Sequence, residues 1–199
     1  MLPPDDELVR GIKDDDEEAF KILYDRYSGK ILRYLYRYIG DYQKAEDLTS
    51  LTFTNVVENI HSYKELGVFS AWLYKIALNC AHREMRNTAR KREISLDKNI
   101  NNGADGEGEN PVSIGDLIED SRNRPDNIAE EKERKEFIYR ALSQLDTKYK
   151  DVLLFCDAEG MTYREAAKIL NTNKINIGIR LMRARRMLYD LLKQFIKDL

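Results

Sequence analysis

The chain has 199 residues, 34% of them charged, yet its formal net charge is only −2, so total charge does not point to a nucleic acid or a membrane as partner. No segment approaches the roughly 18 consecutive apolar residues of a membrane span, and the acidic N-terminus is unlike a signal peptide. Cys80 and Cys156 lie far apart without metal-ligand spacing, which predicts ordinary thiols in a reducing cytosol.

The charges are nevertheless concentrated in segments. Residues 1–20 hold eight acidic side chains against two basic ones. By contrast, residues 82–92 hold five bases against one acid, and residues 174–193 hold six against one. Two basic segments in an otherwise acidic chain favour two separate contacts with a polyanion, although either segment alone could be a solvated helix face.

The first 92 residues have the pattern of a helical bundle. Apolar and aromatic residues recur at helical spacing over residues 17–38, with three aspartates before this segment and Gly40 after it. Further helices are predicted over about 42–60 and 69–90, and no segment alternates as a strand would.

A change of composition follows. Residues 93–126 carry nine acids against three bases and few large apolar side chains, so they are predicted to be a flexible acidic linker. Helices return in residues 127–199, where the pattern predicts them over about 127–143, 147–158, 162–170 and 174–197. The predicted fold is all-α: two small helical domains, 1–92 and 127–199, joined by the linker.

The last two helices form a predicted helix-turn-helix. Thr162 and Glu165 have the spacing of a capping box. Asn171 can adopt the left-handed conformation that ends the first helix, and Asn173 can cap the second. A short helix, a tight turn and a long basic helix are typical of a motif whose second helix enters the major groove of DNA.

The long last helix has two apolar faces. One is predicted to pack on the preceding helices and consists of Ile177, Leu181, Ala184 and Leu188. The opposite face mixes apolar and basic side chains: Ile175, Ile179, Met182 and Arg186, flanked by Arg180 and Arg183. Arginines can bind phosphates, and isoleucine or methionine can contact thymine methyl groups. The alternative is that this face packs on another subunit or domain.

The helix over 69–90 carries a second candidate surface. Phe69, Leu73 and Cys80 are its predicted core. Beside them runs a stripe of Trp72, Ile76, Asn79, Arg83, Arg86 and Arg90. An aromatic ring, an amide and a row of arginines suit unpaired nucleic acid, whose bases stack while its backbone follows the cations. The alternative is a core tryptophan beside solvated arginines.

Enzymatic constellations are not evident. His61 and His82 have no apparent nucleophile or metal partner, and the carboxylates lie mostly in acidic, water-exposed runs. We therefore expect no catalytic residue, no metal site, no cofactor and no small-molecule substrate.

With these motifs in place, the sequence resembles a bacterial sigma factor of the sigma-70 family, in its extracytoplasmic-function (ECF) group. The segments that resemble region 2 are "DELVRGIKDDDEEAFKILYDRYSGKILRYLYRYIGD", "AEDLTSLTF" and "FSAWLYKIALNCAHREMR". Those that resemble region 4 are "ALSQLDTKYKDVLLFCDAEGMTYREAAKIL" and "RLMRARRML". The resemblance covers roughly 150 residues and implies an RNA polymerase subunit that recognises and melts promoters.

The resemblance also implies roles for single residues. Asp47, Leu48 and Leu51 would dock on the clamp helices of the polymerase β′ subunit. The promoter −10 element, with one base flipped out near Asn79 and the 61–68 loop, would be held by Trp72, Asn79, Arg83, Arg86 and Arg90. The −35 element would be read by Lys174, Asn176, Arg180, Arg183 and Arg186. Region 4 would also bind the β flap, and the linker would thread toward the active-centre and RNA-exit region.

Two further expectations concern regulation and location. An anti-sigma factor is an expected partner, and the protein is expected in the cytoplasm, where such a partner can hold it at the inner membrane face. As a hypothesis, the outward residues Ile175, Ile179 and Met182 form a surface that this partner covers. Changing all three to serine should then weaken partner binding.

The sequence departs from the family pattern at two places. Ser50 stands where many members have glutamine. Where many members carry "GTVKSR", this chain has residues 175–180, Ile-Asn-Ile-Gly-Ile-Arg, so −35 specificity is expected to be atypical. Gly178 itself costs about 1 kcal/mol of helix stability relative to alanine.

Two other functions fit parts of the pattern. A helix-turn-helix regulator acting without polymerase would bind duplex DNA tightly by itself and would not need the stripe on residues 69–90. A sigma-like adaptor that binds only proteins would tolerate charge reversal at Arg83 and Arg183.

Overall fold

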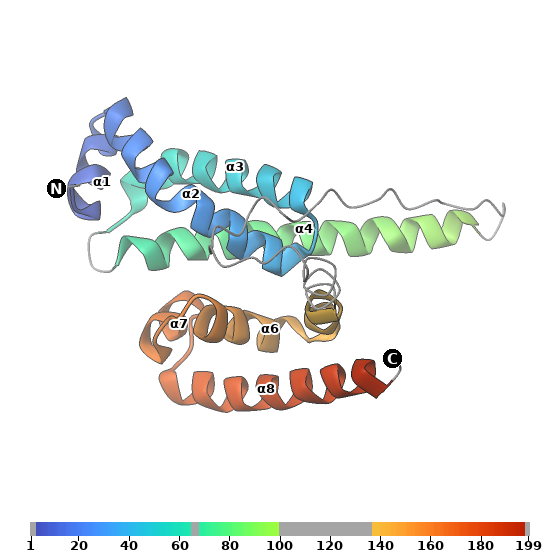
Figure 1. Ribbon diagram of the computed structural model, residues 1–199. Coiled ribbons are helices and arrows are strands. Elements are labelled where there is room, and N and C mark those ends of the chain that lie inside the picture. Colours follow the sequence, from blue (N-terminus) through green and yellow to red (C-terminus); the bar gives the residue numbers. More distant parts are fainter. Residues whose placement is uncertain (1–2, 65–67, 100–136, 198–199) are drawn as a thin grey trace, which may run out of the picture.

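The computed structural model describes residues 3–64, 68–99 and 137–197, and every regular element in these ranges is a helix (Figure 1). This confirms the all-α prediction. The first layer contains α1 (Asp5–Lys13), α2 (Glu17–Ile39), α3 (Tyr42–Asn59), the short 3₁₀ helix η1 (Ile60–Ser62) and α4 (Phe69–Asn99). The second layer contains a helix over residues 137–144, α6 (Thr147–Leu153), the π-helical turn η4 (Leu154–Ala158), α7 (Tyr163–Ile169) and α8 (Lys174–Lys197).

Helix ends in the first layer follow the local signals. The Asp16 carboxylate caps α2 by accepting from the backbone N–H groups of Glu18 and Ala19 at 2.9 and 3.2 Å. Gly40 ends α2 with a φ of 78°, a left-handed conformation that glycine adopts without strain. The short helix α1 was not predicted; its Leu8, Val9 and Ile12 are buried against α2 and η1.

The turn before α8 is built as predicted. Thr162 and Glu165 form both bonds of the capping box, which fixes the start of α7. Asn171 lies at φ 49°, and the Asn173 side chain accepts from the backbone N–H of Asn176 at 2.8 Å. The helix-turn-helix is therefore confirmed as local structure.

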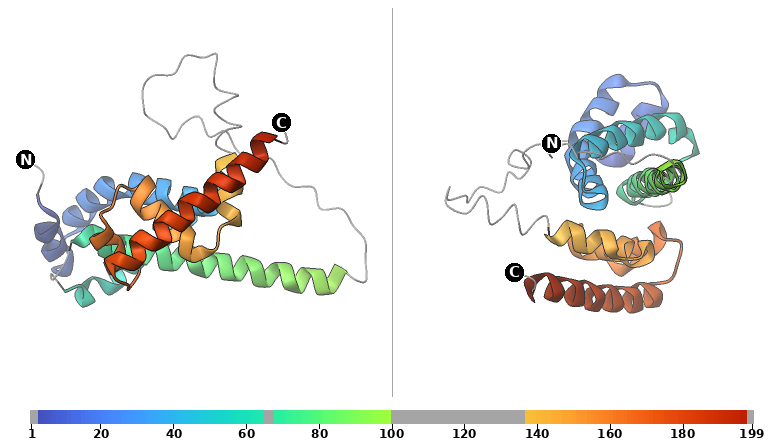
Figure 2. Two further views of the ribbon diagram at one scale, coloured as in Figure 1. Left: turned by 90° about the horizontal axis from the view of Figure 1, so that it is seen from below. Right: turned by 90° about the vertical axis from the view of Figure 1, so that its right-hand side faces the viewer.

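The predicted end of α4 was wrong. The helix does not stop near residue 90 but continues to Asn99, so residues 93–99 belong to a helix rather than to a linker (Figure 2). The reason is local: residues 91–99 contain no glycine or proline, and the first glycine comes at 103. The rest of the predicted linker, 100–126, and the start of the predicted helix 127–143 lie outside the described residues.

The two layers pack directly on each other. Phe155, in η4, stacks on Tyr34 of α2 with ring centroids 5.2 Å apart and planes 11° apart. Tyr74 of α4 meets the same phenylalanine edge-on. One buried core therefore continues through both predicted domains, and the sequence analysis did not foresee this contact.

Candidate nucleic-acid interfaces

The α4 stripe, defined as Trp72, Ile76, Asn79, Arg83, Arg86 and Arg90, lies on the surface. The predicted core residues beside it, Phe69, Leu73 and Cys80, are all buried. Asn79 and the three arginines are exposed, while Trp72 and Ile76 are half-buried. The stripe is thus a surface anchored at one end by partly buried apolar side chains.

Trp72 has both a packed and an open side. Its ring lies 5.1 Å from the Tyr63 ring and 5.8 Å from the Phe69 ring, measured between centroids. These contacts fix its orientation, while its remaining surface lines the hollow described next. One side of the Trp72 ring therefore packs as a core residue would, and the other side is open to a stacking base.

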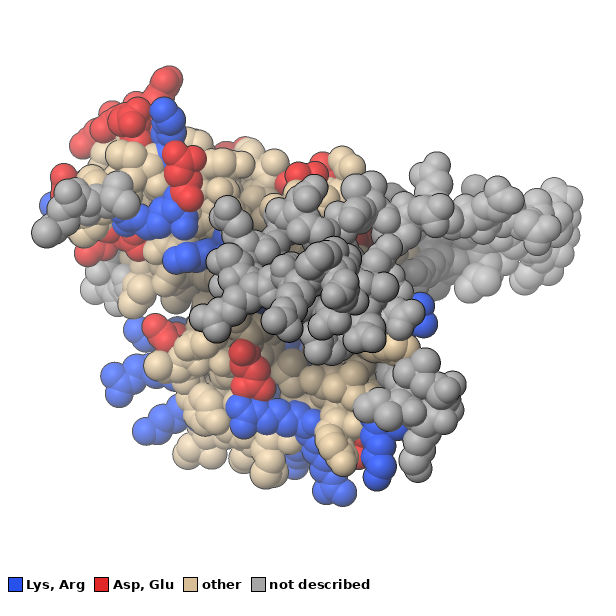
Figure 3. Space-filling view, in the orientation of Figure 1, with Lys and Arg blue, Asp and Glu red and all other residues tan. Residues whose placement is uncertain are grey.

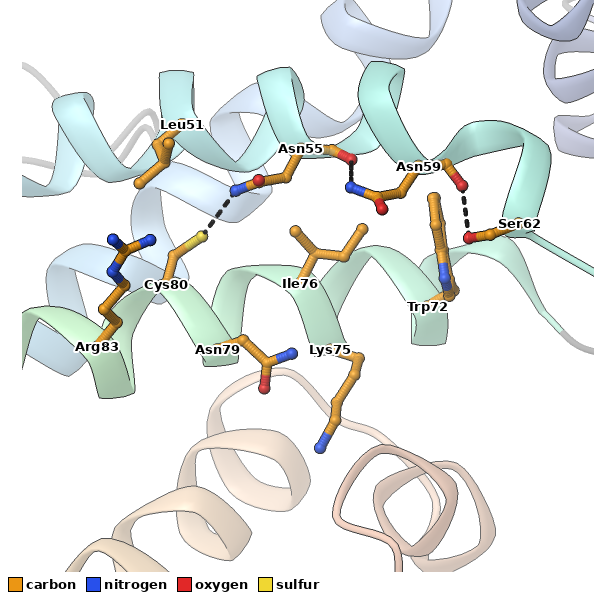
Figure 4. A pocket seen from close by; sticks show the side chains of 10 residues that line it. All are labelled: Leu51, Asn55, Asn59, Ser62, Trp72, Lys75, Ile76, Asn79, Cys80 and Arg83. Carbon is orange, nitrogen blue, oxygen red and sulfur yellow. Dashed lines mark hydrogen bonds between the residues drawn. The ribbon is translucent and has the colours of Figure 1, made fainter.

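A hollow of about 400 Å³ lies between α3 and α4 (Figure 4). This volume is within the range of about 300 to 1,000 Å³ found for small-ligand pockets. Its rim on α3 is fixed by side-chain bonds: the Asn59 amide donates to the Asn55 carbonyl at 2.8 Å, and Ser62 donates to the Asn59 carbonyl at 2.7 Å. Its ten lining residues are Leu51, Asn55, Asn59, Ser62, Trp72, Lys75, Ile76, Asn79, Cys80 and Arg83.

The structure thus gathers Trp72, Asn79 and Arg83 around one hollow and leaves Arg86 and Arg90 in line beyond it. Of the 61–68 loop, Ser62 lines the hollow, while residues 65–67 lie outside the described residues. The sequence analysis did not single out Asn55, Asn59 or Lys75. The sequence does not show that these residues line one cavity, because their side chains come together only when α3 packs on α4.

The second interface is the outward face of α8. The inward face is confirmed, since Ile177, Leu181 and Ala184 are buried and Leu188 is half-buried. On the opposite side Ile175 and Met182 are each 67% exposed and Ile179 is 42% exposed. In Figure 3 basic side chains gather over the surface formed by α7 and α8, while acidic ones crowd around α1 at the far end.

The cations around this face differ in their pairing. Arg185 donates to both carboxylate oxygens of Asp157, at 2.9 and 2.6 Å, and is held within the second layer. Among the described residues, no carboxylate pairs with the predicted −35 cations Lys174, Arg180, Arg183 and Arg186. These four, together with the exposed Asn176, remain available for an anionic partner.

The predicted polymerase-docking residues are only partly exposed. Asp47 is exposed and Leu51 is 41% exposed, but Leu48 is 7% exposed and belongs to the core. The expectation that Leu48 faces outward was therefore wrong. Leu48 lies about one helical turn before Leu51 on α3, but α2 and α4 both pack on this helix and bury more of its surface than one narrow stripe. Further along α3, Val57 is 46% exposed, whereas Val56 is fully buried.

A buried polar cluster that was not predicted from the sequence joins the layers. The Tyr38 hydroxyl donates to Asp151 at 2.6 Å, and the Lys150 ammonium donates to the Tyr38 carbonyl at 2.6 Å. His82 Nε2 lies 3.2 Å from the same Asp151 oxygen, so this histidine has a partner from the other layer. Nearby, Tyr74 and Arg37 both donate to Glu159, at 2.6 and 2.7 Å.

Burial shapes the electrostatics of this cluster. It lowers the pKa of Lys150 to about 8, against the opposing effect of the Asp151 charge. Burial, the Asp151 charge and the hydrogen bond to Asp151 all raise the pKa of the Tyr38 hydroxyl. Tyr34 is fully buried, burial raises its pKa, and its hydroxyl has no hydrogen-bond partner among the residues that the structure describes.

Neither a cluster of metal-ligating side chains nor a membrane-spanning helix is present in the described residues. No group of three histidine, cysteine, aspartate or glutamate side chains gathers as metal ligands would. No helix there is long and apolar enough to cross a membrane.

Each of the two layers matches the model of a known protein family. Residues 23–91 match the model described as sigma-70 region 2, and residues 136–188 match the model described as sigma-70, region 4. Together the two segments cover more than half of the chain.

Similar curated proteins span nearly the whole length. The ECF RNA polymerase sigma-E factor of Haemophilus influenzae is 25% identical over 92% of this chain and 93% of its own. The protein of the same name in Escherichia coli K12 is 26% identical over 97% and 96%. The RNA polymerase sigma-H factor of Pseudomonas aeruginosa is 23% identical over 98% and 96%.

Two solved structures share the fold. One is CnrH in complex with the cytosolic domain of CnrY, with a TM-score of 0.67, 21% identity and coverage of 96% of this chain and 97% of that one. The other is the sigma factor RpoE in complex with the anti-sigma factor NepR from Bartonella quintana, with a TM-score of 0.59, 22% identity and coverage of 87% and 96%.

Proposed function

The chain belongs to the sigma-70 family, in its ECF group of RNA polymerase sigma factors, and from this membership we propose which surfaces carry out promoter recognition. As a sigma factor it acts in transcription initiation, together with core RNA polymerase and promoter DNA. The first layer takes the melted −10 strand on α4, and the second layer takes the −35 duplex on α8.

The hollow between α3 and α4 carries the −10 assignment. It offers a half-buried indole, an amide and a guanidinium around one cavity, with a row of exposed arginines leading away from it. A base turned out of the stack could lie against Trp72 while Asn79 donates to and accepts from its edge. Arg83, Arg86 and Arg90 would follow the phosphates of the same strand.

The −35 assignment is supported by the helix-turn-helix geometry and by the cations of α8. Lys174 and Asn176 stand at the N-terminal end of the helix, which is the end that enters the groove in this motif. The half-buried Arg180 and the exposed Arg183 and Arg186 follow along the helix. These five residues would position the duplex through phosphates and base edges.

The remaining partners follow from the same assignment. On α3, the exposed Asp47 and Leu51 are suited to a partner helix and are proposed to dock on the β′ clamp helices, while the buried Leu48 supports them from below. An anti-sigma factor is a further proposed partner. Of the two proteins that share the fold, RpoE was solved in complex with the anti-sigma factor NepR, and CnrH was solved in complex with the cytosolic domain of CnrY. The chain itself is proposed to have no catalytic activity, and to work in the cytoplasm, where polymerase and promoters are found.

The experiment that tests this proposal compares forked promoter DNA with an unpaired −10 strand against the same DNA fully paired. Holoenzyme assembled from core polymerase and the protein should bind the forked probe more tightly. Changing Arg83 and Arg86 to alanine should reduce the preference and lower the salt slope by about 1.4, since a single-strand phosphate contact contributes about 0.7. Arg185→Ala is the control, because that guanidinium is already paired with Asp157.

Two outcomes would favour another function. The protein would be an ordinary helix-turn-helix regulator if it bound duplex DNA tightly and sequence-specifically without polymerase, and if substitution of Arg83 left this binding unchanged. Function unchanged by charge reversal at Arg83 and Arg183 would indicate a protein-binding adaptor.

A further inference from the structure

The outward face of α8 has an unusual composition for a DNA-reading surface. Its centre is apolar: Ile175, Ile179 and Met182 project from one side of the helix and are largely exposed. The two isoleucines can neither donate nor accept a hydrogen bond, and the Met182 thioether is only a weak acceptor. Any sequence preference they supply must therefore come from apolar contact.

Gly178 lies at the edge of this face, about one helical turn from Ile175 and from Met182 and directly before Ile179. A Cβ at this position would meet only the Tyr163 ring, at 3.5 Å, which is an ordinary van der Waals distance. Packing therefore does not require glycine here, and helix stability opposes it. What glycine does provide is a shallow floor beside Ile175 and Met182, where another molecule can approach the helix backbone closely.

The surroundings of this face are cationic. Lys174, Arg180, Arg183 and Arg186 border it without a carboxylate partner among the residues that the structure describes. Arg164 and Lys168 of α7 are exposed nearby in the same helix-turn-helix. Charge complementarity therefore favours a polyanion as the occupant, with an apolar feature at its centre.

Among the base pairs of duplex DNA, only those with thymine present an apolar group in the major groove, the C5-methyl. We propose that Ile175 and Ile179 are specificity-determining residues that recognise thymine methyl groups, and that Gly178 lets the helix come close enough for both contacts. This inference rests on the proposed −35 contact of α8. The two isoleucines are four residues apart, about 6 Å along the helix, so the contacted thymines lie within about two base pairs of each other.

The test uses holoenzyme and duplex sites selected from a random pool. In the selected upstream element, each thymine is replaced in turn by deoxyuridine, which removes only the methyl group. Wild-type holoenzyme should lose about fourfold in affinity at each contacted thymine, the value expected for one buried methyl group. Ile175→Ala and Ile179→Ala should each abolish the loss at one thymine while leaving the salt slope unchanged.

Two further variants sharpen the result. Gly178→Leu should weaken binding to the thymine-containing site, because it fills the floor of the face. Met187→Ala is the matched control, an exposed apolar residue on another side of the same helix, and should keep the full sensitivity to deoxyuridine.

The inference is overturned if wild-type holoenzyme binds thymine and deoxyuridine sites equally. It is also overturned if the selected upstream element lacks neighbouring thymines, or if both isoleucine variants keep the sensitivity. Failure to select any upstream element would instead overturn the proposed −35 function itself, so the two failures are distinguishable.

Discussion

The hydroxyl of Tyr38 in α2 donates a 2.6 Å hydrogen bond to Asp151 in α6, and so ties the layer with the α4 stripe to the layer with α8. Both partners are almost fully buried. The Lys150 ammonium donates to the Tyr38 carbonyl, and His82 Nε2 lies 3.2 Å from the same Asp151 oxygen. The two proposed DNA-binding surfaces are thus held in one packed body by contacts between the layers.

Asp151→Ala should destabilise this body strongly. The change leaves the Tyr38 hydroxyl and the Lys150 ammonium buried without their carboxylate, and we expect the free energy of unfolding to fall by about 3 kcal/mol. Urea unfolding measures this loss. The control is Asp157→Ala, which removes an exposed pair with Arg185 and should cost less than about 1 kcal/mol. Equal losses in the two variants would contradict a special role for the buried contact.

Lys150 should make the stability depend on pH between about 8 and 9.5. In the folded protein its pKa is lowered to about 8, whereas in the unfolded chain it stays near its ordinary value. The unfolded chain therefore binds more protons in this window, and the free energy of unfolding should rise with pH, by at most about 1.4 kcal/mol per pH unit.

Urea unfolding of wild type and Lys150→Met over this range checks the effect, since the variant should lack the rise. The neighbouring Tyr38 hydroxyl does not mimic this effect, because its raised pKa lowers stability only above about pH 10, where unfolded tyrosines ionise. A rise of the same size in both proteins would contradict the assignment to Lys150.

Tyr34→Phe should stabilise the protein. The Tyr34 hydroxyl is fully buried and finds no partner in the structure, which costs about 1 to 3 kcal/mol, while the ring keeps its stacking on Phe155. Tyr38→Phe is the paired comparison and should have the opposite sign, because that hydroxyl is bound to Asp151. Thermal unfolding of the two variants distinguishes them directly, and a loss of stability in Tyr34→Phe would show that its hydroxyl is satisfied.

Gly178→Ala should raise stability by about 1 kcal/mol, since alanine is the better helix former and its methyl group meets the Tyr163 ring at an ordinary distance. Circular dichroism during thermal unfolding measures the shift. A lower melting temperature than wild type would mean that the Tyr163 ring cannot accommodate even a methyl group.

Local sequence signals predicted the local structure well. The caps at Asp16 and Thr162, the left-handed residues Gly40 and Asn171, and the two faces of α8 all follow from short-range chemistry that a sequence displays directly. The α4 stripe was likewise visible as a helical pattern.

What the sequence did not reveal depends on contacts between distant segments. The hollow beside Trp72 needs α3 and α4 to pack, and the buried position of Leu48 depends on how much of α3 its neighbours cover. The pairing of Tyr38 with Asp151 spans 113 residues, and nothing in either local sequence marks it. The extension of α4 was missed because the acidic composition of the segment outweighed its lack of helix-breaking residues.

The most direct test of the sigma-factor assignment is run-off transcription with core RNA polymerase and the purified protein, on DNA fragments from its own upstream region. Wild-type protein should give transcripts from a defined start, and Asn79→Ala combined with Arg83→Ala should reduce them at least tenfold, while Arg185→Ala should not. The absence of any promoter-specific transcript with the wild-type protein, under all conditions tested, would contradict the account.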